Sequence, residues 1–182
     1  MYFDKPGKEN TKATLKEAYE RGKELGLTEL VVASTTGDTA FKAQEIFDGF
    51  TITSVTYHCG FKEPFKSVMD PEAKKALESK GVRVVSATHA LSGVEKAVAA
   101  KHSGVYPALL IADTLRLLGQ GTKVAVEVAI MAADSGNLTG KDIVSIGGSG
   151  RGADTALILK PANMSGLFDM RIREIVCKPR DF

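Results

Sequence analysis

The chain has no tryptophan, only two cysteines, and a formal net charge of just +2 over 182 residues. Cys59 and Cys177 lack the spacing of metal ligands, so they indicate neither a zinc site nor a disulfide framework. A net charge this small, without basic runs interleaved with aromatics, gives no support to binding of nucleic acid or a membrane surface.

Long apolar runs are also absent. No run approaches membrane-spanning length, and residues 1–6 contain no apolar region of a signal peptide. With so few cysteines, this predicts a reduced, cytoplasmic setting. The hydrophobic and charged fractions, 43% and 25%, are ordinary for a globular protein. The length fits a single domain over residues 1–182 with a substantial core.

Apolar β-branched segments alternate with segments of helical periodicity. We expect strands at 29–34, 51–57, 82–86, 142–146, 155–160 and 171–177, and helices at 10–25, from about 40, at 71–81, from 93, at 107–118 and at 123–133. Asp70-Pro71-Glu72 is a helix start signal, and Ser92 with Glu95 has capping-box spacing. The alternation predicts an α/β fold with a mostly parallel sheet and an antiparallel edge.

The first expected strand stops abruptly at a polar turn that leads into a helix. The residues suited to holding a phosphate there are Ser34, Thr35, Thr36, Gly37 and Thr39. Backbone N–H groups and the helix dipole at such a turn attract anions. Helix capping by Thr36 or Asp38 is the alternative interpretation. The carboxylate of Asp38 would compete with an anion for the same donors.

A glycine run follows the strand at 142–146. It consists of Gly148, Ser149, Gly150, Arg151 and Gly152. A strand rather than a helix follows it, so it is no dinucleotide fingerprint. It is either a mobile hairpin connection or a loop whose glycines admit an anion that Arg151 contacts.

In a parallel sheet these two turns meet at one edge, the edge where open α/β sheets bind ligands. The loop after the second strand adds His58, Gly60 and Phe61, and the third strand leads to His89. The two histidines face each other in this arrangement, but a metal site would need a third ligand, and none is evident. His58 and Cys59 are chain neighbours whose side chains point apart, which argues against a nucleophile pair.

The segment 123–133 is unusually apolar for a helix and is expected to be well buried. Glu127 lies in its middle. A partly exposed or paired carboxylate is the expectation there, and a functional buried carboxylate is the alternative.

Three segments, 30–40, 123–133 and 142–150, resemble the pyruvate kinase C-terminal domain. In that family the first segment is a hydroxyl-rich turn that holds a sugar phosphate. The resemblance implies a three-layer α/β/α sandwich of about five strands, in the order 3-2-1-4-5 with the fifth antiparallel. It does not imply pyruvate kinase activity, which belongs to a barrel domain. Asp38 departs from the effector turn and disfavours fructose bisphosphate.

The whole chain is similar to small stand-alone prokaryotic proteins named after that domain, which are associated with flavin mononucleotide (FMN). The resemblance therefore implies an FMN-binding protein, with a phosphate in the two turns and His58, Gly60, Phe61 and His89 near the ring or sugar. No residue stands out as a catalytic acid or base, and no metal is expected. A non-catalytic sensor of a sugar phosphate or nucleotide is the alternative. We also expect a homo-oligomer.

Overall fold

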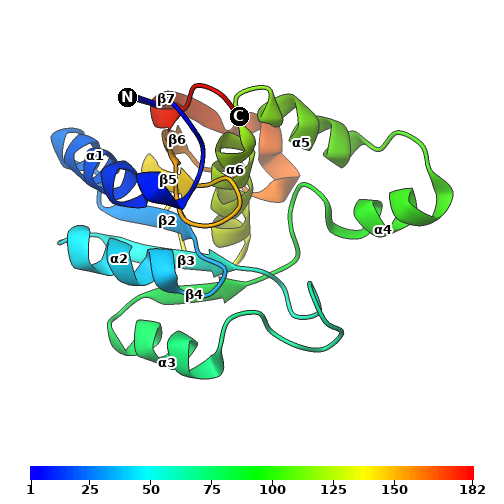
Figure 1. Ribbon diagram of the computed structural model, residues 1–182, viewed down its shortest axis with the longest axis horizontal. Helices are drawn as coiled ribbons and strands as arrows, with labels where there is room; N and C mark the ends of the chain where they lie inside the picture. Colours follow the sequence, from blue (N-terminus) through cyan, green and yellow to red (C-terminus); the bar gives the residue numbers. More distant parts are fainter.

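The structure is a computed structural model that describes residues 1–182, and it alternates strands and helices along most of the chain (Figure 1). The elements are β1 (Tyr2–Phe3), a 3₁₀ turn η1 (Lys8–Asn10), α1 (Thr11–Glu24), β2 (Glu29–Ala33), α2 (Asp38–Ile46), β3 (Thr51–Thr56), α3 (Pro71–Ser79), β4 (Arg83–Ser86), α4 (Gly93–His102), α5 (Pro107–Arg116), α6 (Gln120–Asp134), β5 (Ile143–Gly147), β6 (Thr155–Lys160), η2 (Met164–Asp169) and β7 (Arg171–Pro179).

One sheet of seven strands runs in the order β1-β7-β6-β5-β2-β3-β4. Its central part, β4-β3-β2-β5-β6 with β6 antiparallel, confirms the predicted order and the α/β class. The expected count of five strands is wrong, because β7 pairs with β6 and β1 pairs with β7. β1 is only two residues long, and a segment this short leaves no period-2 signal in the sequence.

Helices cover both faces of the sheet and divide the core in two. One cluster includes Leu15 of α1, Ala40 of α2 and Leu77 of α3. The other lies under α6 and includes Ala129, with α5 packed outside it. The layers form the expected α/β/α sandwich, and α4 stands away from the sheet (Figure 1). None of the helices has the length and apolarity needed to cross a membrane.

Two helix starts test the predicted start signals. Asp70 Oδ1 accepts a hydrogen bond from Glu72 N at 2.8 Å, with a proline at the first position of α3, as predicted. The expected capping box at α4 does not form, since the Ser92 side chain makes no capping bond. Glu95 Oε2 instead accepts from Ala108 N at 2.9 Å and caps α5. The carboxylate serves the neighbouring helix because Tyr106, the residue before α5, offers no side-chain cap.

α6 approaches the end of β5 so closely that only glycine fits at the contact. A Cβ on Gly147 would lie 2.2 Å from the carbonyl oxygen of Gly121 and 2.7 Å from Ala125 N. A Cβ on Gly121 would in turn lie 2.1 Å from Thr155 Oγ1. These glycines therefore set the distance between α6 and the sheet edge where β5 ends.

We predict that Gly147→Ala lowers the free energy of unfolding by about 3 kcal/mol, at the top of the usual range for overpacking, because backbone atoms would have to move. Gly150→Ala, three residues on, is the matched control: its Cβ meets open space, and only the left-handed φ of +81° opposes it. That strain costs about 1 kcal/mol. Urea unfolding measures both, and equal losses would contradict the close-approach argument.

Candidate functional site

A cavity of about 680 Å³ lies along the edge of the sheet where β5, β2, β3 and β4 end. Its wall includes residues from the turns that follow these strands. The sequence-predicted residues that line it are Ser34, Thr35, Thr36, Thr39, His89, Gly148, Gly150, Arg151 and Gly152. Gly37, His58, Gly60, Phe61 and Ser149 lie close by in the chain but outside the lining. The predicted meeting of the polar turns at one edge is therefore observed.

The turn after β2 is shaped by glycine and closed by serine. Gly37 has a φ of +106°, in the left-handed region, and is the residue before α2. The Ser34 hydroxyl accepts a hydrogen bond from Ala40 N at 3.2 Å, so Ser34 closes the turn rather than Thr36 or Asp38. Thr56 Oγ1 donates to the carbonyl of Thr35 at 2.8 Å and ties the turn to the end of β3.

This arrangement leaves a row of donors without protein acceptors. The backbone N–H groups of residues 35–39 donate to no carbonyl and no side-chain oxygen in the structure. Free N–H groups are normal in the first turn of a helix, and the helix dipole adds partial positive charge there. Thr36 and Asp38 are exposed at this turn, whereas Thr39 is buried. The turn can therefore bind an anion, with the Asp38 carboxylate as the one opposing charge on it.

The glycine turn after β5 is held by Asp154, which is fully buried. Asp154 Oδ2 accepts from Ser149 N and from Gly7 N, each at 3.0 Å, and Oδ1 accepts from Thr155 Oγ1 at 2.8 Å. The N–H group of Ser149 is therefore used inside the protein. Its hydroxyl oxygen is buried and has no partner.

Internal packing explains two glycines of this run. A Cβ on Gly148 would lie 2.2 Å from the carbonyl oxygen of Gly152, and one on Gly152 would lie 2.6 Å from Lys8 Cα. Gly150, at the tip, faces open space. The turn is thus a fixed part of the cavity wall packed against the N-terminal segment, and Arg151 extends from its exposed side.

Cations outnumber anions around the cavity. Lys8, Lys42, Lys62 and Arg151 line it, all are exposed, and none forms a salt bridge. The acidic residues in the lining are Asp38 and Glu127. Unpaired cations at a concave surface raise the local concentration of anionic ligands. The three lysines were missed from the sequence because only the fold brings η1, α2 and the 58–66 loop together.

A second part of the cavity wall is apolar and comes mainly from α6. Val124, Val128 and Met131 lie on one face of this helix, and Ala33 and Val55 extend the surface from the sheet. The i, i+4, i+7 spacing places the three α6 side chains in one row. Such a wall accommodates a planar or aliphatic group next to the polar turns.

Four rings cluster near the ends of β3 and β4. Tyr57 and Phe61 have ring centroids 4.0 Å apart, and His89 lies 5.1 Å from Phe61 and 5.5 Å from His58. The histidines therefore face each other as predicted. Tyr57 and His89 line the cavity, whereas Phe61 packs against Tyr57 and His58 against His89 outside the lining. The structure contains no group of three or more His, Cys, Asp or Glu side chains placed to hold a metal.

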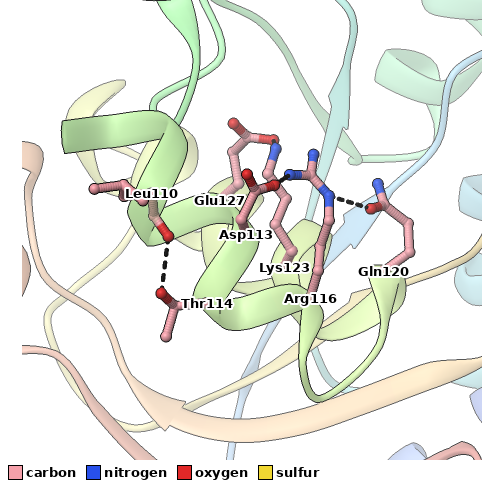
Figure 2. A network of polar contacts seen from close by, with 7 residues as sticks. All are labelled: Leu110, Asp113, Thr114, Arg116, Gln120, Lys123 and Glu127. Carbon is pink, nitrogen blue, oxygen red and sulfur yellow. Dashed lines mark hydrogen bonds and ion pairs between the residues drawn. The ribbon is translucent and has the colours of Figure 1, made fainter. Parts of the chain in front are cut away.

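A buried ion pair forms part of the same wall. Lys123 Nζ donates to Glu127 Oε2, and Leu91 N donates to Glu127 Oε1 at 2.9 Å. Figure 2 shows the two side chains of the pair pointing toward each other on α6, beside Arg116 and Gln120. Glu127 is 3% exposed, so the expectation of partial exposure is wrong, although the expected pairing is present. The carboxylate is almost fully covered because α6 lies between the sheet and α5.

The chain matches the model of a known protein family. The model of the pyruvate kinase alpha/beta domain matches residues 12–159. Two solved structures of pyruvate kinase from Cryptosporidium parvum are similar to the chain at 15% sequence identity. One covers 75% of this chain and 20% of the enzyme, with a TM-score of 0.39. The other, in complex with ADP, covers 93% of this chain and 24% of the enzyme, with a TM-score of 0.42. The chain thus spans about a quarter of these enzymes or less.

The titration of His89 is expected to make the stability of the protein depend on pH. Burial lowers the pKa of its imidazole below the ordinary 6.5, Glu127 partly opposes this, and Lys123, His58 and Lys96 add to it. Between the folded and unfolded pKa values the unfolded chain binds more protons, so the free energy of unfolding falls as the pH drops through that window. Urea unfolding from about pH 7.5 to 5.5 measures this slope.

His89→Phe is the matched comparison, because it keeps a ring against Phe61 and removes the titrating group. We expect a flatter stability profile in the variant over the same pH range. Parallel profiles in the two proteins would contradict the assignment of the slope to His89.

Proposed function

This chain belongs to the pyruvate kinase alpha/beta domain family, and within that family we propose that it binds a phosphorylated small molecule with a planar ring, specifically FMN. Pyruvate kinase activity is not part of the proposal, because the family match concerns the alpha/beta domain alone. The proposed site is the cavity at the carboxyl ends of β5, β2, β3 and β4.

A single observation carries the proposal: one cavity is lined both by Thr35, Thr36, Asp38 and Thr39, whose N–H groups are free, and by the apolar face of α6. Donors and cations at one end suit a phosphate, which is a strong acceptor of charge-assisted hydrogen bonds. An apolar wall with Tyr57 beside it suits a planar ring. The residues present therefore fit FMN, whose phosphate and ring lie at opposite ends of one molecule.

We assign the phosphate to Ser34, Thr35, Thr36, Gly37 and Thr39, with Gly148, Ser149, Gly150, Arg151 and Gly152 on the other side. We assign the ring and sugar to the region of His58, Gly60, Phe61 and His89. Within these sets, the residues in the cavity lining would contact the ligand. Gly37 shapes the first turn, and Phe61 and His58 support the rings of Tyr57 and His89.

Bound flavin would supply redox chemistry, and the protein would bind it, orient it and exclude water from the apolar wall. Whether the protein is a flavoenzyme is a separate question, answered by turnover with a reduced nicotinamide. The alternative function is a non-catalytic sensor of a sugar phosphate or nucleotide. Mass spectrometry of the small molecules that co-purify with the protein, and their visible spectrum, separate these ligands.

We predict that Arg151→Ala weakens FMN binding about ten- to a hundredfold, because a charge-assisted contact is worth roughly 1.5–3 kcal/mol. Thr36→Glu should also weaken it, since a carboxylate would face the donors of the first turn. Riboflavin lacks the phosphate, so its affinity should be about the same for the wild type and for both variants. Fluorescence quenching gives the dissociation constants.

Lys141→Ala is the matched control, because Lys141 is exposed and precedes β5, at the opposite edge of the sheet. It should leave FMN affinity unchanged. Thr36→Glu binding FMN as tightly as the wild type would overturn the phosphate assignment. If Arg151→Ala leaves FMN affinity unchanged while Thr36→Glu weakens it, the first turn alone holds the phosphate.

We also propose a homo-oligomer in which a second copy covers the α4–α5 segment. α4 contains no buried residue, and a ten-residue helix is marginal by itself. Val94, Val105 and Leu117 are 76%, 77% and 78% exposed.

We therefore expect light scattering at micromolar concentration to give a mass of more than one copy. In Leu117→Glu the measured mass should shift toward that of the monomer. Phe168→Glu, an equally exposed apolar position on η2, is the control. A monomeric wild type would overturn this.

A further inference from the structure

We propose that Glu127 and His89 form a second polar subsite, which hydrogen-bonds a neutral head group carrying an N–H donor beside a carbonyl acceptor. This inference rests on the proposed function and concerns the end of the ligand farthest from its phosphate. A lactam or imide edge has this chemistry, and the ring system of FMN carries one.

The order of the strands separates the two ends of the cavity. The glycine turn follows β5 and His89 follows β4, and β2 and β3 lie between these strands. Three strand spacings amount to about 14 Å. A ligand whose phosphate lies in the turns after β5 and β2 would therefore bring its other end to His89 only if it is elongated.

The Glu127 carboxylate supplies a buried acceptor at that end. It accepts one hydrogen bond on each oxygen, from Lys123 Nζ and from Leu91 N, and each oxygen keeps a further lone pair. Glu127 lines the cavity between Val124 and Val128 although its side chain is almost fully buried. A hydrogen bond made here is stronger than one in water, because the surroundings are apolar.

His89 supplies the complementary group. It lines the cavity, and its neutral imidazole has one donor nitrogen and one acceptor nitrogen. The bond from Leu91 N to Glu127 ties down the turn on which His89 sits, so the carboxylate also fixes the imidazole. Acceptor and donor thus both line the cavity, and a lactam or imide edge needs one of each.

Charge favours a neutral head group here. Lys123 already compensates Glu127 inside the protein, so a charged group would add an unpaired charge to an apolar wall. A structural role alone, in which Glu127 only anchors Leu91, predicts no dependence of ligand affinity on the N–H group of the ligand. The two roles can therefore be separated by experiment.

The first test needs no mutation. Wild-type protein is titrated with FMN and with FMN methylated at its imide nitrogen, which removes the donor. We expect the methylated probe to bind about tenfold more weakly or worse, the factor that one net hydrogen bond supplies. Equal affinities would overturn the subsite.

The second test uses His89→Phe, with His102→Phe as the matched control, because His102 is an exposed histidine at the end of α4 outside the cavity lining. His89→Phe should weaken FMN and riboflavin by the same factor, about tenfold, because both carry the head group. His102→Phe should change neither by more than about threefold. An unchanged affinity of His89→Phe for FMN would overturn the subsite and leave the proposed function intact.

The third test concerns the carboxylate. In Glu127→Gln the buried Lys123 would lose its partner, so Glu127→Gln is combined with Lys123→Met to keep the wall neutral. We expect the double variant to lose most of the preference for FMN over the methylated probe. An undiminished preference overturns the role of Glu127. A wild type that binds no flavin overturns the proposed function, and the subsite with it.

Discussion

The buried carboxylate of Asp154 holds together the two segments on which the polar end of the cavity depends. A carboxylate out of reach of water is costly unless its oxygens are hydrogen-bonded, and here they accept from Gly7 N, Ser149 N and the Thr155 hydroxyl. Separating the N-terminal segment from the β5–β6 turn would break the hydrogen bond from Gly7 N to this carboxylate. Lys8 follows Gly7 directly and Arg151 lies two residues after Ser149, so this one group holds the backbone close to both cations.

Parallel strands made the edge of the sheet predictable from the sequence. The turn at 34–39, the loop at 58–61 and His89 each follow a strand, and carboxyl ends of parallel strands meet at one edge. The order of the strands came from the resemblance of three segments to a known domain, since periodicity does not determine which strands are neighbours. β1 was not predictable, because two residues show no periodicity and form a strand only by pairing with β7.

The remaining differences arise where tertiary packing decides. Lys8, Lys42 and Lys62 look like solvated surface lysines in the sequence, and only the fold places them around one cavity. Glu127 looked like a carboxylate that reaches water, as most do on amphipathic helices. Enclosure of α6 by α5 leaves Glu127 only 3% exposed, and the i, i+4 spacing to Lys123 was the available signal for a pair. Likewise Glu95 has capping-box spacing but caps α5, because that helix lacks a side-chain cap of its own.

Charge is distributed unevenly along the cavity, and this asymmetry constrains the ligand more than any single residue does. At the β5–β2 end, Lys8, Lys42 and Arg151 have no salt-bridge partners and a row of N–H groups has no acceptor, whereas Lys62 lies on the loop after β3. At the β4 end, the carboxylate is already neutralised by Lys123 within the wall. An anion gains charge-assisted hydrogen bonds at the first end and would meet uncompensated burial at the second. The cavity therefore favours a molecule that is anionic at one end and neutral, planar and polar-edged at the other.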